Sequence, residues 1–501
     1  MELKNINFLS TNLFSEQFND YVSKNHLSID NIHNACEKVS LSSHKRTVLS
    51  EVLSDQYNGI QETSEVRKNI DALNHENTFT VTTGHQLNIF TGPLYVIYKI
   101  VSAIKLSQEL SNKFPEKKFV PIYWMASEDH DFEEIKSFCA FGKEYSWNIN
   151  PTGSVGKIDP TSLRSILEEL PENIPFFEDA YLKSNTLSEA VRKYMHFLFG
   201  SYGLIVLDAS SKRLKSGFTN IIKDDILKNT IYGISSSDKK SQVHVRKINF
   251  FYMKDNLRER IVFEGNSYKV NHSDISFTEE EIIKEIDENP QYFSPNVISR
   301  CLYQESILPN VSYLGGPAEV VYWLEFKKFF DAYNINFPVV MPRDFVLLIT
   351  KRNQKILDKY GIDFSHLFEE KKNVIEKVLD INTNKENNFD DEIKSIKDIY
   401  DSLVEKYAKI DKSMSGNILS RSKKTIKEIS ELEKRFKKAQ KLSNTKFVEN
   451  IDGLYNSLFA NGSSQERYTN FLNFYLSDKM FIESLVKNLN PLNLAYKVIK
   501  L

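Results

Sequence analysis

Residues Phe79–Phe132 read FTVTTGHQLNIFTGPLYVIYKIVSAIKLSQELSNKFPEKKFVPIYWMASEDHDF. Two apolar runs, at 79–83 and 119–126, each end in polar residues. Between them, apolar residues recur at the spacing of one helix face, at Ile97, Ile100, Val101 and Ile104. The pattern predicts a β-α-β unit, whose two strands must be parallel because a helix forms the crossover. Both polar clusters then lie beyond the carboxyl ends of the strands, where open α/β sheets bind ligands, so the stretch favours an enzyme.

The same design recurs further along the chain. Tyr313 and Leu314 run into Gly315-Gly316-Pro317, a helix is predicted over 318–333, and a strand over 337–341 ends just before Arg343. Another predicted helix, at 190–200, leads into the apolar run 203–207. These repeated units predict an α/β fold with a doubly wound parallel sheet.

The patterns divide the chain into four parts. We expect a helical layer, a catalytic core with a small antiparallel insert at about 212–300, a helical coiled-coil hairpin, and a C-terminal segment that packs on the core. Their predicted bounds are 1–73, 74–355, 356–460 and 461–501. The insert is predicted from two β-type runs, 249–253 and 260–263, that flank turn residues.

The hairpin is predicted from a long stretch without proline, between Pro342 and Pro491. Within it apolar residues recur every three or four positions among Lys and Glu, at Ile393, Ile396, Tyr400, Leu403, Tyr407, Ile410 and Met414, and again at Ile426, Ile429, Leu432 and Phe436. Turn residues at 413–417 interrupt the pattern, which predicts an antiparallel hairpin of coiled-coil type. Such a hairpin either packs on its own chain or forms a dimerisation arm.

Bulk properties exclude several classes of protein. The chain has 501 residues, too many for one compact core, so we expect two to four domains. The 65 Lys and Arg residues nearly balance the 67 Asp and Glu residues, which argues against a nucleic-acid-binding protein. No stretch approaches the ~20 apolar residues of a membrane span, and the chain starts without a signal-type apolar core. The cysteines Cys36, Cys139 and Cys301 match no metal-site spacing, so we expect a cytoplasmic location.

The first polar cluster is the turn Gly84-His85-Gln86, followed by Gly92 at the predicted start of a helix that Thr91 would cap. Glycine allows close approach of a ligand, helix amides favour a phosphate or carboxylate, and His85 could donate a hydrogen bond in a transition state. Thr-Thr-Gly-His resembles the T/H-x-G-H signature of nucleotidylyltransferases. The alternative is a turn glycine beside a structural histidine.

A late phosphate-gripping loop would support that resemblance. The segment 234–240, Ile-Ser-Ser-Ser-Asp-Lys-Lys, looks similar to one but sits beside the antiparallel insert, so we interpret it as coincidence. No G-x-x-x-x-G-K-[ST] loop is present either. ATP, if it is used, is therefore not held by a Walker loop.

The second polar cluster is Glu128-Asp129-His130-Asp131. Titratable groups this dense repel one another unless a cation, an amine or shared protons relieve them. The cluster could hold a divalent metal, orient a histidine base or bind an ammonium group. It is a poor zinc site because adjacent residues of an extended segment point in alternate directions. The alternative is a solvated acidic turn.

Further candidates surround the second β-α-β unit. Gly315 and Gly316 form another close-approach loop, and Glu319 in the first helical turn could simply partner the helix dipole. Arg343 is placed to hold a carboxylate or phosphate through two parallel hydrogen bonds, with an ordinary salt bridge to a neighbour such as Asp344 as the alternative. Lys99 could reach a phosphate, with an ordinary solvated lysine on a helix as the alternative.

Taken together, these residues resemble the bacillithiol-biosynthesis cysteine-adding enzymes, the BshC family. The motifs that carry the resemblance, in order over nearly the whole chain, are Thr83–Gln86, Thr91–Tyr95, Tyr98-Lys99, Trp124, Glu128–Asp131, Ser294–Asn296, Gly315–Pro317, Glu319, Pro342-Arg343 and Gln465–Arg467. The resemblance implies a Rossmann-like core, an antiparallel connecting region and a coiled-coil domain that pairs two subunits into a homodimer. It also implies a ligase that joins the carboxyl group of cysteine to the amine of glucosaminyl-malate in the last step of bacillithiol biosynthesis.

Amide formation from a free carboxylate is uphill, so the leading hypothesis is activation of cysteine by ATP as an acyl-adenylate. Gly84 amides and Arg343 would bear the charge, and His130 or Asp131 would be the base. Glu128 or Asp129 would bind the ammonium of cysteine or a magnesium ion. One alternative is a nucleotidylyltransferase-like enzyme that acts on another thiol or sugar. The other is a non-catalytic scaffold built around the coiled-coil hairpin.

Overall fold

The core of the computed structural model is a five-stranded parallel sheet with strand order β13-β12-β2-β3-β6. The structure describes residues 2–8, 11, 13–24, 27–60, 64–235, 243–382, 388–411, 413, 415–443 and 445–501. The sheet strands are β2 (Thr78–His85), β3 (Lys118–Met125), β6 (Ile205–Asp208), β12 (Asn310–Gly315) and β13 (Val339–Pro342). From β2 the chain first builds outward through β3 and β6 and later through β12 and β13 on the other side. The strand order therefore reverses between β2 and β12, and the predicted doubly wound fold is confirmed.

Both faces of this sheet are covered. Successive residues of β3 alternate between two apolar clusters: Ile122 and Trp124 belong to one, and Tyr123 and Met125 to the other. The main covering helices are α5 (Leu94–Lys113), α9 (Leu187–Phe199), α14 (Val297–Ile307) and α15 (Pro317–Ala332). Helix α5 ends before Pro115, as the sequence predicts, because proline cannot continue a helix. The sheet is thus a buried middle layer, and ligands can reach it only at its edges.

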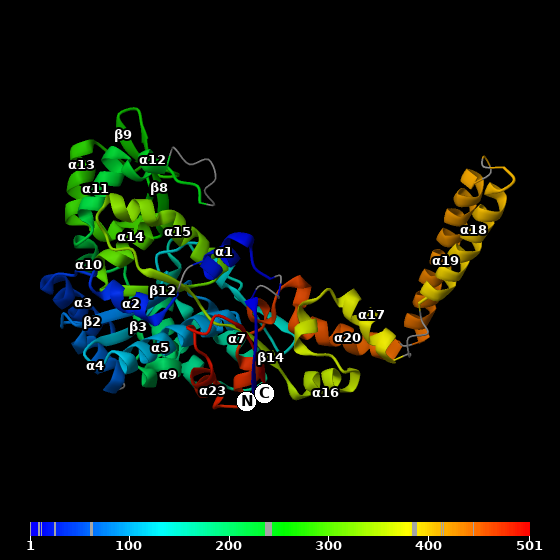
Figure 1. Cartoon of the computed structure of the whole chain (residues 1–501). Coiled ribbons are helices and arrows are strands. Elements are labelled where there is room, and N and C mark those ends of the chain that lie inside the picture. Colours follow the sequence, from blue (N-terminus) through cyan, green and yellow to red (C-terminus); the bar gives the residue numbers. More distant parts are fainter. Residues whose placement is uncertain are drawn as a thin grey trace.

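The insert forms a second, antiparallel sheet, visible in green in Figure 1, with strand order β10-β9-β8-β7-β11. Its strands are β7 (Phe250–Lys254), β8 (Leu257–Glu264), β9 (Ser267–Val270), β10 (Ser276–Phe277) and β11 (Phe293–Pro295), accompanied by α10 (Lys212–Ser216), α11 (Thr219–Lys228), α12 (Thr230–Ser235) and α13 (Glu279–Glu288). Left-handed backbone at Asp255 (φ 52°) makes the turn predicted between the two runs, and Gly265 (φ 59°) makes the next turn. Of the segment 234–240, residues 236–240 lie outside the described residues.

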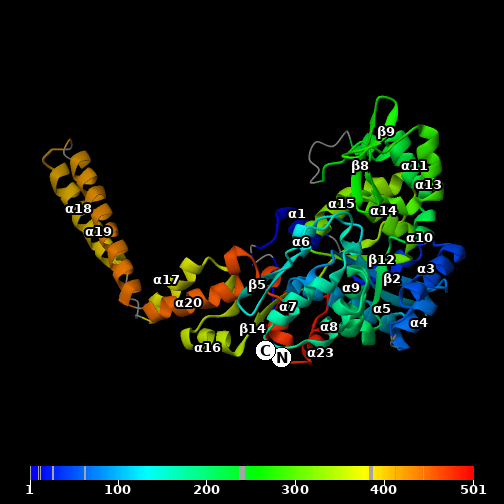
Figure 2. The same cartoon turned by 180° about the vertical axis from the view of Figure 1, so that it is seen from behind.

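The two ends of the chain meet in a third sheet. Strand β15 (Tyr496–Lys500) lies between β1 (Glu2–Ile6), which is antiparallel to it, and β14 (Phe345–Ile349), which is parallel. The chain ends lie next to each other in Figures 1 and 2. The prediction of a helical layer over residues 1–73 was therefore wrong for residues 2–6, because their strand partner lies almost 500 positions away. The predicted helices do follow, as α1 (Glu16–Lys24), α2 (Ile29–Cys36), α3 (Ser43–Gln56) and α4 (Ser64–Ala72).

A two-helix arm extends away from the rest of the molecule in both views (Figures 1 and 2). It consists of α18 (Asp390–Ala408) and α19 (Ser415–Ser443), with α16 (Lys351–Tyr360), α17 (Lys371–Asn382) and α20 (Thr445–Leu458) at its base. The Phe389 and Phe436 rings, 5.7 Å apart, join the two helices. The predicted coiled-coil fold is confirmed, although α19 already includes Gly416 and Asn417 of the predicted turn. Met414 lies outside the described residues.

The remaining α-helices and β-strands are short. They are α6 (Phe132–Ile135), β4 (Ser137–Ala140), β5 (Lys143–Ser146), α7 (Arg164–Glu169), α8 (Pro175–Leu182), α21 (Gln465–Tyr468), α22 (Leu472–Tyr475) and α23 (Phe481–Asn488). Helix α23 buries Phe481 and Leu485 in the apolar cluster that also contains α5. Among the described residues, no helix has the length and apolar character needed to cross a membrane.

Candidate functional site

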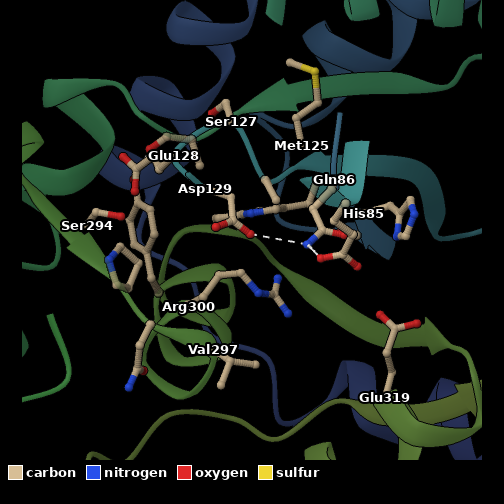
Figure 3. Close-up of a pocket in the computed structure, with 18 of the residues that line it drawn as sticks. His85, Gln86, Met125, Ser127, Glu128, Asp129, Ser294, Val297, Arg300 and Glu319 are labelled. Carbon is tan, nitrogen blue, oxygen red and sulfur yellow. Dashed lines mark hydrogen bonds between the residues drawn. The ribbon is translucent and has the colours of Figure 1, made fainter. Parts of the chain in front are cut away.

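A cavity of about 590 Å³ opens at the carboxyl ends of the central strands (Figure 3). Its wall includes Gly84, His85 and Gln86 at the end of β2 and Glu128, Asp129 and His130 beyond β3. Gly316 and Glu319 beyond β12, Arg343 beyond β13, and Phe251 and Arg258 of the insert complete this part of the lining. The predicted meeting of the two polar clusters at one edge of the sheet is confirmed. The cavity lies where the strand order reverses, which is the usual ligand position of doubly wound folds.

The acidic cluster is held by cations and an amide rather than left to repel itself. Lys215, whose side chain is buried, forms an ion pair with Glu128. The amide of Gln86 donates to Asp129 Oδ2 at 3.3 Å, and Arg258 Nη1 lies 3.8 Å from Asp129 Oδ1. Glu128 and Asp129 therefore each have a partner of their own. These partners lower the free-energy cost of placing two carboxylates next to a cavity.

Asp129 is a permanently charged member of this cluster. Burial raises the pKa of its carboxyl group, but hydrogen bonds from His130 and the nearby Arg258 guanidinium outweigh burial and hold the pKa well below its usual range. The backbone amide of His130 donates to Asp129 Oδ1 at 2.8 Å. Asp129 thus presents a stable negative charge, suited to binding a cation rather than to accepting a proton.

His130 is oriented by the insert. Its Nδ1 contacts Arg258 Nη1 and lies 3.5 Å from Asp129 Oδ1. Nδ1 is therefore shared between two partners: it accepts from the Arg258 guanidinium when it carries no hydrogen, and it can donate to Asp129 when it carries one. The three side chains of His130, Asp129 and Arg258 contact one another. A proton added to the His130 ring would therefore change which of them forms the hydrogen bond at Nδ1.

His85 lies at the other side of the cavity and is uncharged at neutral pH. Burial above all, and the nearby charge of Lys99, lower the pKa of His85 to about 3. Its Nε2 lies 3.2 Å from the hydroxyl oxygen of Tyr95. His85 can therefore form hydrogen bonds as a neutral ring, but it does not supply a positive charge to a phosphate.

Two cations expected to face the ligand are paired with protein carboxylates instead. Lys99 Nζ lies 2.9 and 2.8 Å from the two carboxylate oxygens of Glu319. Arg343 makes two parallel hydrogen bonds, at 2.9 and 2.8 Å, to Glu466, and both side chains are less than 5% exposed. The predicted geometry at Arg343 is present, but its partner is a residue of α21.

Glu319 has a structural function as well. It accepts a hydrogen bond from the Gly316 amide at 2.8 Å and so caps the start of α15. Gly315 makes this turn possible, because a Cβ there would lie 2.9 Å from Glu319 Cβ. The loop amide of Gly316 is thus already satisfied by the protein.

Four candidate residues are not part of the described cavity wall: Gly92, Lys99, Asp131 and Gly315. Asp131 caps the short helix α6 through the Glu134 amide, 3.3 Å away. Gly92 precedes α5 in a turn with φ 63°, and the N-cap is Pro93 rather than the predicted Thr91. A Cβ on Gly92 would lie 2.7 Å from Asn88 Cβ, so this glycine serves the turn.

Sequence reasoning missed several residues of the cavity wall. Arg258 comes from the insert strand β8, Arg300 from α14, and Glu134 from α6, where it accepts a hydrogen bond from Gln86 at 2.5 Å. The motif Ser294–Asn296, which marks the family resemblance, also lines the cavity and was the closest signal to Arg300. Among the described residues no group of three or more His, Cys, Asp or Glu side chains could hold a metal ion.

The fold and this cavity define a Rossmann-like α/β protein with an enzyme-type ligand site at the switch point of its sheet. Residues 1–344 match the model of the N-terminal Rossmann-like domain of bacillithiol biosynthesis BshC, and residues 346–501 match the model of its C-terminal coiled-coil domain. The chain belongs to the BshC family.

Full-length relatives agree with this assignment. A protein of Flavobacterium johnsoniae named "Putative cysteine ligase BshC" is 39% identical, with 99% of each chain covered. A protein of the same name from Cytophaga hutchinsonii is 36% identical, with 95% of each chain covered. The family resemblance inferred from the motifs is confirmed.

Proposed function

We propose that the chain is a cysteine ligase that joins the carboxyl group of cysteine to the amine of glucosaminyl-malate, the last step of bacillithiol biosynthesis. Membership of the BshC family supports the reaction class. The observation that carries the proposal is the shared cavity, which places fixed carboxylates and guanidinium groups around one space at the sheet edge. Such a lining is complementary to a zwitterionic amino acid and an amine acceptor.

Asp129 is the residue we assign to the ammonium group of an amino-acid substrate. It lines the cavity and keeps its negative charge because its pKa lies well below the usual range. Glu128 is less suited to this role, since Lys215 already neutralises it. The sequence offered Glu128 or Asp129 for binding the ammonium group, and we assign this role to Asp129.

His130 is the residue we assign to deprotonation of the amine, because Asp131 caps α6 and does not line the described cavity. A proton taken up at His130 Nδ1 would displace the contact with Arg258. Asp129, which lies 3.5 Å from Nδ1 and 3.8 Å from Arg258 Nη1, can accept from both cations afterwards. The geometry therefore gives the transferred proton a hydrogen-bond acceptor in Asp129.

ATP would supply the activated leaving group that amide formation from a free carboxylate requires. The described residues fit a polyanion in one respect, because Arg258, Arg300 and Arg467 all reach the cavity. They do not support the roles expected of Arg343 and Lys99, whose charges are neutralised by Glu466 and Glu319. We keep ATP and Mg²⁺ as co-substrates to be tested.

A reconstitution experiment tests the proposal. The purified protein, supplied with cysteine, glucosaminyl-malate, ATP and Mg²⁺, should form bacillithiol, and His130→Ala should abolish turnover without changing the circular dichroism spectrum. Cysteine-dependent exchange of pyrophosphate into ATP should accompany activation. A deletion strain should lose bacillithiol and accumulate glucosaminyl-malate. Loss of a different thiol would favour the nucleotidylyltransferase-like alternative.

We also propose that the arm pairs two copies of the chain. Apolar side chains remain exposed on it at Ile399, Leu403, Tyr407, Ile410, Leu419, Leu432 and Phe436. Leu432 is 51% exposed and Phe436, one helical turn further on, is 42% exposed. Two helices leave this stripe uncovered, and a second hairpin would bury it.

A further inference from the structure

The arginines of the cavity differ in how much of their charge is already neutralised. Arg343 is paired with Glu466, and Arg258 is shared between Asp129 and His130. Arg467 is exposed, so water and salt screen it. Arg300 is partly enclosed, and no carboxylate of the described residues lies within ion-pair distance of it.

The hydrogen-bond partners of Arg300 are neutral. Nη1 donates to Gln304 Oε1 at 3.1 Å, and Nη2 donates to the thiol sulfur of Cys301 at 3.3 Å. Burial raises the pKa of the Cys301 thiol to about 12, so this neighbour carries no negative charge at neutral pH. The guanidinium is held in place by neutral groups, and Glu319, whose charge also acts on it, is already paired with Lys99.

A buried polar chain fixes this arrangement from behind. Gln304 Nε2 donates to Glu305 Oε1 at 2.7 Å, and Asn310 Nδ2 donates to the same oxygen at 2.8 Å. Asn310 in turn accepts from Thr82 Oγ1 at 2.8 Å, on the strand that leads to Gly84. The Tyr313 ring, with its centroid 6.0 Å from the guanidinium carbon, flanks the cation. Arg300 is preorganised in the sense that its supporting residues are themselves hydrogen-bonded.

The space in front of Arg300 borders Gly84. A Cβ on Gly84 would lie 3.5 Å from Arg300 Nη1, so a methyl group there would sit directly beside the guanidinium. Figure 3 shows the Arg300 side chain extending into the open centre of the cavity, between the Asp129–Gln86 hydrogen bond and Glu319. A charged guanidinium without a carboxylate, facing a cavity, is the arrangement that binds a carboxylate or phosphate.

We propose that Arg300 is the anion-binding residue of this cavity and holds a carboxylate or phosphate group of a substrate beside Gly84. The role of Gln304, Glu305 and Asn310 is then to position Arg300. This inference rests on the proposed function for the identity of the substrates, but anion binding can be measured without any reaction.

Titration calorimetry on the full-length protein tests the inference with four separate probes. Cysteine and cysteamine differ only by the carboxylate, pyrophosphate represents a nucleotide tail, and malate represents the acceptor. Arg300→Met should weaken one anionic probe about 100-fold, the loss expected when one partner of an enclosed charge pair is removed. Arg300→Lys should restore part of the affinity. Arg164→Gln, which removes an exposed charge on α7 outside the described cavity wall, should change nothing.

Gly84→Ala provides a second test that keeps the charge. The added methyl group would meet only ordinary contacts of 3.4 to 3.6 Å, so the fold should persist while the same anion binds more weakly. The inference is overturned if no anionic probe distinguishes the wild type from Arg300→Met. If binding depends on Arg300 but no amide product forms, the inference stands and the proposed function fails.

Discussion

Ion pairs in and behind the cavity wall decide which cations remain for a ligand. Lys99 and Arg343 follow the sequence pattern of phosphate-binding residues, yet each meets a carboxylate from a distant segment. Nothing along the chain shows that their charges are neutralised while Arg300 meets no carboxylate within ion-pair distance among the described residues. The sequence therefore shows which side chains are charged. Whether a charge is neutralised by a partner depends on which segments the fold brings together.

The Arg343–Glu466 pair should be essential for stability. Glu466→Gln leaves a buried guanidinium without its countercharge, which costs about 3–5 kcal/mol of the free energy of unfolding. Urea unfolding followed by tryptophan fluorescence measures this loss. The double variant Arg343→Met, Glu466→Leu should recover most of it, since no buried charge is left unpaired. Equal stability of Glu466→Gln and the wild type would show that Arg343 finds another partner.

Glu305 should make stability dependent on pH. Burial raises the pKa of Glu305 to about 8, so between pH 4.5 and 8 the folded protein holds a proton that the unfolded chain releases. Stability from this group is then present at low pH and is lost as the pH rises through 8. Glu305→Gln keeps the neutral shape, so between pH 5 and pH 9 it should lose less stability than the wild type, by on the order of 2–4 kcal/mol. An equal loss of unfolding free energy between pH 5 and pH 9 in the two proteins would contradict this expectation.

At the scale of elements, the sequence predicted those helices and strands whose formation depends on nearby residues. Strands β2 and β3, helix α5 and the unit β12–α15–β13 were predicted because their apolar periodicity and their glycine or proline boundaries lie within a few tens of residues. The sheet of β1, β14 and β15 was not predicted, because each strand has five residues and its partners lie far away along the chain.

The same distinction applies to the candidate site. Gly84, Glu128, Asp129 and His130 were found because they lie at or just beyond the carboxyl ends of strands of the parallel sheet. Arg258 and Arg300 were missed because they reach the cavity from the insert and from a helix, and spacing along the chain carries no sign of that approach. The predicted topology identified the part of the cavity wall that the sheet strands form. It did not identify the parts that the insert and helix α14 contribute.

The insert should therefore be required for catalysis and not only for folding. Arg258→Gln removes the cation that β8 places against His130 and Asp129. We expect turnover to fall about 10- to 100-fold, as for other residues that orient a reacting side chain, with little change in the thermal midpoint. Lys269→Gln, an exposed charge on the neighbouring strand β9, is the matched control. A large loss of thermal stability with Arg258→Gln would assign Arg258 a structural role instead.

At the scale of the whole molecule, the cavity belongs to both matched regions of the chain. Its lining includes Arg467, and Glu466 neutralises Arg343, although both come from the region that matches the coiled-coil domain. The N-terminal region alone would leave Arg343 unpaired and β15 absent. Residues of both matched regions therefore form the cavity together, whereas the arm is separate from the cavity.

The arm should control assembly without controlling chemistry. Leu432→Glu with Phe436→Glu places two charges on the exposed apolar stripe, so we expect a dimeric wild type to become monomeric in sedimentation velocity. Lys434→Glu, on the opposite side of the same helix, should leave the dimer intact. Of the described residues that line the cavity, none belongs to α18 or α19, so the monomer should retain cysteine-ligating activity. A monomer without activity would mean that the partner subunit completes the site, and an unchanged dimer would place the interface elsewhere.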